Sequence, residues 1–117
     1  MDEDRRKLER KHLVHQLMVF DRDTGDLAGY LVDITTEGIM LMSRDPIEAG
    51  VTRKFRMLLP AKIRGSLEVA FDARSVWSRR TIPSGLYEIG FRLLGVSEED
   101  MDTIRSLIDE FGTTSSQ

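Results

Sequence analysis

The stretch LEVAFDARSVWS at residues 67–78 alternates apolar and polar side chains along most of its length. This period of two is typical of a β-strand with one buried face, because successive side chains point to opposite sides. The stretch YEIGFRL at residues 87–93 has the same period. The turn-rich residues 79–85 between them predict a hairpin. We therefore expect a fold built from antiparallel strands.

The chain before this hairpin follows the same pattern. Residues 12–20 and 27–34 favour strands, and the Asp-, Thr- and Gly-containing residues 21–26 between them predict another hairpin. A further extended run at residues 39–42 ends at Asp45-Pro46, and residues 55–59 alternate up to Pro60. The pattern predicts six short strands in all.

The period changes only near the C-terminus. Ser97, followed three residues later by Asp100, approximates a capping box. Gly112 supplies a stop signal, so we expect a helix at about residues 97–111 and a disordered polar tail at 113–117. The predicted apolar stripe of this helix consists of Met101, Ile104, Leu107, Ile108 and Phe111. The predicted class is all-β with one C-terminal helix, a small six-stranded antiparallel β-barrel.

The composition favours one globular domain. The chain has 117 residues, of which 40% are hydrophobic and 32% charged, and its apolar runs are too short for a membrane span. It has no cysteine, and its first residues are acidic rather than those of a secretory signal. We therefore expect a cytoplasmic protein. The net charge of −3 argues against a protein that coats a nucleic acid polymer.

The charge is unevenly distributed. Residues 5–12 carry five Arg or Lys side chains and a histidine against the single acid Glu9. Such a cluster on an acidic chain predicts a local site for an anion. We expect residues 1–12 to form a flexible basic arm in front of a single domain at 13–112.

Two motifs occur in a defined order. Arg6-x-x-x-Arg10 lies in the arm, and Asp33-x-Thr35-x-x-Gly38 follows the strand predicted at 27–34. Their order and separation resemble the signature of the PilZ domain family, small bacterial barrels that bind the second messenger cyclic di-GMP. The resemblance extends over nearly the whole chain and implies a PilZ-like split barrel.

The resemblance implies that the arginines of the arm hold the ligand. A guanidinium can bind phosphate or the O6 and N7 atoms of guanine, and it can stack on a base. In an extended arm, Arg6 and Arg10 are roughly 13 Å apart and can grip different parts of one dinucleotide. An extra arginine before the motif accompanies the binding of two stacked cyclic di-GMP molecules in the family, so Arg5 favours that stoichiometry.

The second motif would supply the base contacts. The carboxylate of Asp33 can accept the paired N–H groups of a guanine edge. Thr35 keeps the hydroxyl that the family usually provides as serine, although its methyl group can crowd the ligand. Gly38 lacks a side chain, which permits a positive φ and a close approach of the backbone to the base.

Each feature also has a structural explanation. Basic arms are often only solvated segments, and Asp33 to Gly38 alone is typical of a strand-connecting turn. Trp77 is in phase with Phe71, which favours a place in the core or at the barrel rim. His12 and His15 lie three apart in a predicted strand and would point to opposite faces, so we expect no metal site.

We expect no catalysis and no cofactor, because the sequence has no nucleophile elbow, phosphate-binding glycine loop or metal-ligand cluster. The leading hypothesis is a cyclic di-GMP receptor whose arm orders on binding and signals to a protein effector of motility, adhesion or exopolysaccharide and biofilm formation. A ligand-independent PilZ-like adaptor between proteins is the alternative. A single-strand nucleic-acid barrel is disfavoured by only eight aromatic residues in an acidic chain.

Overall fold

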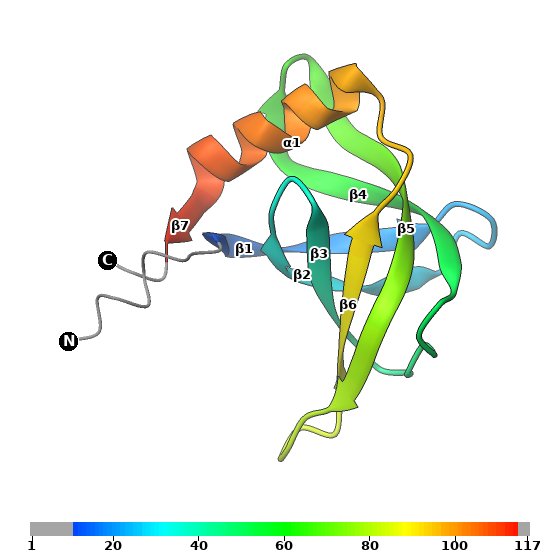
Figure 1. Ribbon diagram of the computed structural model, residues 1–117. Helices are drawn as coiled ribbons and strands as arrows, with labels where there is room; N and C mark the ends of the chain where they lie inside the picture. Colours follow the sequence, from blue (N-terminus) through cyan, green and yellow to red (C-terminus); the bar gives the residue numbers. More distant parts are fainter. Residues whose placement is uncertain (1–10, 115–117) are drawn as a thin grey trace.

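The computed structural model describes the backbone of residues 11–114 and the side chains of residues 17–111. Most of this part of the chain is strand (Figure 1). In chain order the elements are β1 (Lys11–Asp21), β2 (Leu27–Ile34), β3 (Gly38–Ser43), β4 (Thr52–Ile63), β5 (Ser66–Arg80), β6 (Tyr87–Leu93), α1 (Glu98–Phe111) and β7 (Gly112–Thr114).

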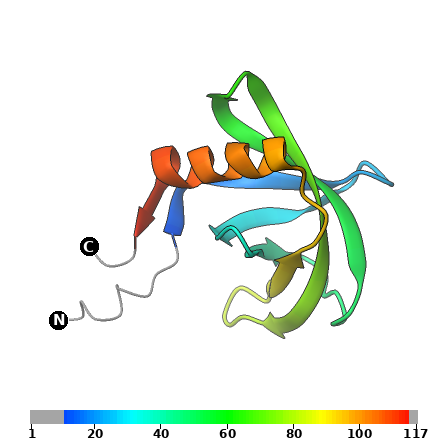
Figure 2. The same ribbon diagram turned by 45° about the horizontal axis from the view of Figure 1, so that its top comes forward.

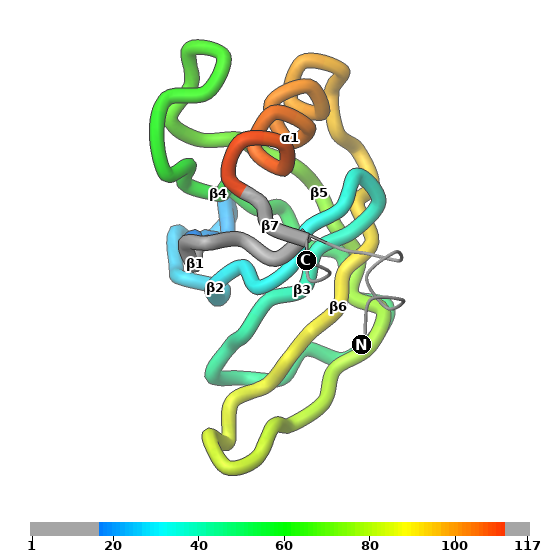
Figure 3. Tube along the Cα trace, turned by 90° about the vertical axis from the view of Figure 1, so that its left-hand side faces the viewer, coloured from blue at the N-terminus to red at the C-terminus, as the bar shows by residue number. Residues whose placement is uncertain are grey.

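Six strands form a closed antiparallel barrel. They are hydrogen-bonded in the order β2-β3-β6-β5-β4-β1, and an additional pairing of β1 with β2 closes the ring. The short strand β7 pairs with the first residues of β1. The helix α1 lies across one end of the barrel (Figure 2), and the β5–β6 hairpin projects from the opposite end (Figures 1 and 3). The predicted fold class is confirmed.

Three phenylalanines from neighbouring strands meet in the barrel interior. The ring of Phe55 packs edge to face against those of Phe71 and Phe91, with centroid separations of 6.1 and 5.1 Å. This geometry adds about 0.5–1.5 kcal/mol per pair to the burial of the rings. The other buried apolar side chains in the described part of the chain are Leu17, Val19, Leu31, Ile34, Ile39, Leu41, Met57, Ile63, Val69, Ala73, Ile89, Ile104 and Leu107.

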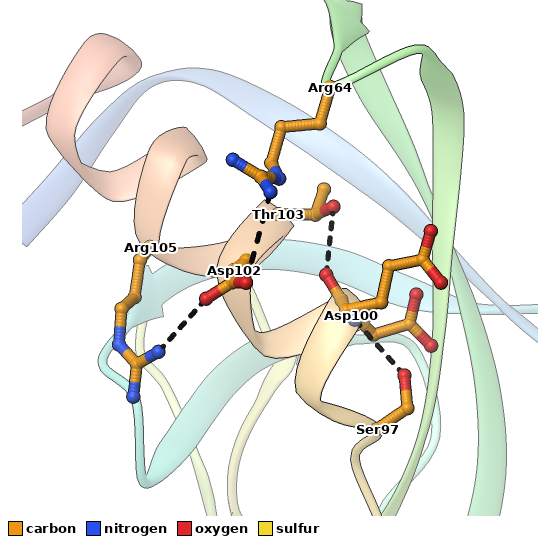
Figure 4. Close-up of polar contacts among 7 residues, drawn as sticks. Arg64, Ser97, Asp100, Asp102, Thr103 and Arg105 are labelled. Atoms are coloured by element: carbon orange, nitrogen blue, oxygen red, sulfur yellow. Dashed lines mark hydrogen bonds and ion pairs between the residues drawn. The ribbon is translucent and has the colours of Figure 1, made fainter.

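The C-terminal helix has the predicted boundaries and cap. The backbone N–H of Asp100 donates to Oγ of Ser97 over 3.0 Å, so Ser97 is the N-cap residue (Figure 4). The predicted stripe faces the barrel, because Ile104 and Leu107 are fully buried. Arg64, in the turn between β4 and β5, reaches Asp102 of the helix at 3.8 Å (Figure 4).

Three boundaries differ from the prediction. β1 begins at Lys11, inside the segment predicted as an arm, and β7 forms at Gly112–Thr114, where a tail was expected from residue 113. These two segments pair with each other, so each supplies the partner that the other needs. β4 continues through Pro60, where its register with β5 is interrupted, so the missing N–H breaks no ladder bond.

The described part of the chain has no helix that is long and apolar enough to cross a membrane.

Candidate functional site

The Asp33–Gly38 motif forms the connection between β2 and β3. The hydroxyl of Thr35 accepts hydrogen bonds from the backbone N–H groups of Glu37 and Gly38, each at 3.1 Å. The N–H of Thr35 donates to the carbonyl of Gly38 over 2.9 Å. Thr35 therefore closes the turn through hydrogen bonds within its own loop, as expected for a segment that connects two strands.

Asp33 faces away from the barrel interior because β2 carries a bulge. Leu31 pairs with Leu41 of β3, but two residues later Asp33 pairs with Met40, the immediate neighbour of Leu41. Regular alternation from the buried Leu31 would place Asp33, two residues later, in the interior. The bulge at Val32 instead turns the carboxyl group to the face that carries Met40. The residue remains only 4% exposed.

Gly38 is required by the contact between two strands. A Cβ atom at this position would lie 2.5 Å from the carbonyl oxygen of Phe91 on β6. Gly38 does not use the positive φ that a glycine permits, since the glycines with positive φ in the described residues are Gly25, Gly50, Gly65 and Gly85. The close approach at Gly38 is to the backbone of β6.

A cleft of about 350 Å³ opens beside the motif. One wall is the β2–β3 connection, and the other is formed by the outer faces of β5 and β6. The lining residues are Asp33, Ile34, Thr35, Glu37, Gly38, Ile39, Met40, Val76, Trp77, Gly90, Phe91 and Arg92. The structure thus brings all three residues of the second motif to one cleft.

Trp77 forms a wall of this cleft and is not a core residue. A bulge between Ser75 and Trp77 reverses the alternation of β5, so the phase shared with Phe71 is lost and the ring is 39% exposed. The ring lies directly over Gly90, where a Cβ would be 2.4 Å from its Nε1 atom. A glycine in the middle of an alternating strand often marks a place where another group packs closely against the backbone. Gly90 is such a residue, and this signal could have located Trp77.

Two arginines lie near the ring and the cleft. The guanidinium of Arg79 lies 5.7 Å from the Trp77 ring centroid and donates to Glu88 over 2.7 Å. Arg92 is exposed, lines the cleft and pairs in register with Gly38. Sequence reasoning missed Arg92, although its polar position beside Phe91 in an alternating strand predicts an outward side chain.

Arg5, Arg6 and Arg10 of the first motif lie outside the described residues. The strand that follows them is described from Lys11, which pairs with Ile34, and His12 pairs with Asp33. The basic segment is therefore joined to the barrel directly beside the second motif.

Among the described residues, no group of three or more His, Asp or Glu side chains could hold a metal ion.

Comparisons with known proteins identify the family. The PilZ domain family matches residues 4–110 of the chain. A solved structure of the Bacillus subtilis inhibitor of motility, MotI/DgrA, is similar in fold, with a TM-score of 0.65 and 13% sequence identity. The match covers 86% of this chain, which spans about half (51%) of that protein. No curated protein sequence gives a significant match. The chain belongs to the PilZ domain family, whose members bind cyclic di-GMP and effector proteins.

Proposed function

We propose that this protein is a cyclic di-GMP receptor that binds the dinucleotide in the cleft between the β2–β3 connection and Trp77. The observation that carries the proposal is the convergence of three features at one place. The cleft contains Asp33, it is walled by an exposed aromatic ring, and it lies beside the strand to which the Arg6-x-x-x-Arg10 segment is joined.

One wall of the cleft can bind the hydrogen-bonding edge of guanine, and the other can stack on the face of the base. The carboxylate of Asp33 is a double acceptor for the N1–H and N2–H groups of the base edge. The exposed ring of Trp77 offers a flat surface for the base, and stacking of this kind contributes about 1–3 kcal/mol per base. Arg92 adds positive charge at the cleft for a phosphate or a carbonyl.

The arm would complete the site. Arg6 and Arg10 would close over the bound ligand, and Arg5 would contact a second, stacked molecule. Ordering of the arm on binding changes the surface next to β1 and β2, and such a change can recruit or release an effector protein. Control of motility, adhesion or exopolysaccharide output by this route, in the cytoplasm and without catalysis, is the function that we propose.

A ligand-independent adaptor is the second candidate. It is favoured by the low exposure of Asp33, 4%, and by the use of the Thr35 hydroxyl within its own turn. Both observations leave less polar surface available to a ligand than the motif suggests.

Isothermal titration calorimetry with cyclic di-GMP tests the proposal and reports the stoichiometry. Changing Arg6 or Arg10 to Ala should each remove about 1.5–3 kcal/mol of binding free energy, which is about a ten- to a hundredfold loss of affinity. Asp33→Asn keeps the side-chain volume and should lower the preference for cyclic di-GMP over cyclic di-AMP. Arg105→Ala, on the exposed face of α1, is the matched control for loss of a positive charge.

Two outcomes would decide against the receptor. Titrations of both arm variants that match the wild type would contradict the arginine contacts on which the receptor proposal depends. No heat from the wild-type protein at high ligand concentration would favour the adaptor.

A further inference from the structure

The tip of the β5–β6 hairpin presents an apolar side chain on a hydrogen-bonded turn. Ile82 is 89% exposed. The turn that carries it is closed by hydrogen bonds from the N–H of Thr81 to the carbonyl of Leu86, 2.7 Å, and between the hydroxyls of Thr81 and Ser84, 2.7 Å. A turn whose backbone is already fixed by hydrogen bonds loses little conformational entropy when a partner covers it.

An open groove lies at the same end of the barrel. It has a volume of about 550 Å³ and runs between the start of β2, the end of β3 and the base of the hairpin. Its apolar walls are Leu27, Tyr30, Met42 and Leu86, of which Leu27 and Tyr30 are exposed. The β5–β6 hairpin lies at the end of the barrel remote from α1 (Figures 1 and 3), and its residue Leu86 lines the groove, so Ile82 and the groove are near each other.

The charges on this face are mixed. Arg44 and Asp45 lie at the groove, and the exposed Arg80 lies at the base of the hairpin. A partner surface of uniform charge would be repelled either by the two arginines or by Asp45. In a dimer with a two-fold axis, Arg80 of each copy can instead face Asp45 of the other.

We propose that this face joins two copies of the chain in a symmetric dimer. Ile82 of each subunit inserts between Leu27 and Tyr30 of the other, and Arg80 of each pairs with Asp45 of the other. The cleft beside Asp33 opens at the opposite end of β2 and β3. The dimer therefore leaves the proposed ligand site open, and it goes beyond the proposed function.

Sedimentation velocity of the full chain over a wide concentration range tests the dimer. Wild-type protein should sediment as a dimer, and Ile82→Asp should weaken association on the order of a hundredfold or more, since two apolar contacts are lost per dimer. Leu67→Asp changes a side chain that is 60% exposed, near the turn between β4 and β5, and should remain dimeric.

A charge exchange adds a test of geometry. Arg80→Asp and Asp45→Arg should each weaken the dimer, and the double variant should regain much of the lost affinity. A wild-type chain that stays monomeric at high concentration would overturn the proposal. The face would then be a surface for a different partner. A dimer unaffected by Ile82→Asp would also overturn it. Ile82→Asp should bind cyclic di-GMP as the wild type does, so the two proposals fail separately.

Discussion

Substitution of Gly90 by Ala should move the aromatic wall of the cleft without breaking the barrel. The added Cβ would lie 2.4, 2.5 and 2.9 Å from three atoms of the Trp77 ring, where ordinary contact begins near 3.4 Å. The ring must therefore retreat by about 1 Å, as expected when a methyl group enters a filled space. Because Trp77 is 39% exposed, it has room to move outward.

The effect on binding should exceed the effect on folding. Alanine stabilises a strand interior over glycine by roughly 0.5–1 kcal/mol, which offsets part of the crowding. Displacement of the ring removes a stacking contribution of about 1–3 kcal/mol per base. This free energy corresponds to a loss of affinity of about five- to 150-fold for cyclic di-GMP.

Calorimetry measures the loss of affinity, and tryptophan fluorescence shows whether the Trp77 ring has moved. Trp77 is the sole tryptophan of the chain, so its emission reports both the displaced ring and the arrival of a ligand. Gly95→Ala is the matched control, because a Cβ there would have its nearest neighbour at 3.9 Å. Trp77→Ala should lose as much affinity as Gly90→Ala, and the double variant should lose no more. Wild-type affinity in a Gly90→Ala protein with altered emission would refute the stacking role.

Further predictions concern the stability of the barrel. Gly38→Ala should cost roughly 1–3 kcal/mol in urea unfolding, because its Cβ meets the backbone oxygen of Phe91, which cannot swing away as a side chain can. Ser97→Ala removes the helix cap and should cost about 1 kcal/mol, seen as a few degrees in thermal melting, and an unchanged melting temperature would contradict the role of Ser97. Phe55→Ala should cost about 3–5 kcal/mol, measured by chemical denaturation, and a cost under 1 kcal/mol would show that the core refills the space.

Prediction from the sequence succeeded for segments whose own residue pattern matches the element that they form in the folded chain. The strand at Tyr87–Leu93 keeps a strict alternation, and α1 combines a cap at Ser97 with an apolar stripe, so both were located closely. The strand β7 was missed because a glycine and two threonines are too few residues to show a period of two, although threonine favours strands. It forms because the first residues of β1 offer a partner.

The grouping of the motif residues followed from the sequence, and their role in binding stays a prediction. The spacing of Asp33, Thr35 and Gly38 placed three residues in one turn, and the structure gathers them at one cleft. The position of Trp77 could not be derived by extending a period of two, because the bulge before it depends on the register with β6. Arg5, Arg6 and Arg10 remain a prediction, since they lie outside the described residues.

The two bulges have a consequence for how such a barrel can vary. One extra residue in β2 lies between the buried Leu31 and the outward Asp33, and one in β5 lies between the buried Ser75 and the outward Trp77. Without that residue, the two side chains of each pair would be adjacent and would still point to opposite faces by ordinary alternation. A barrel of this kind can thus gain or lose one codon at either point while its core and its pocket keep their partners. Among related genes, such an event registers as a gap in an alignment and is invisible to a count of substitutions.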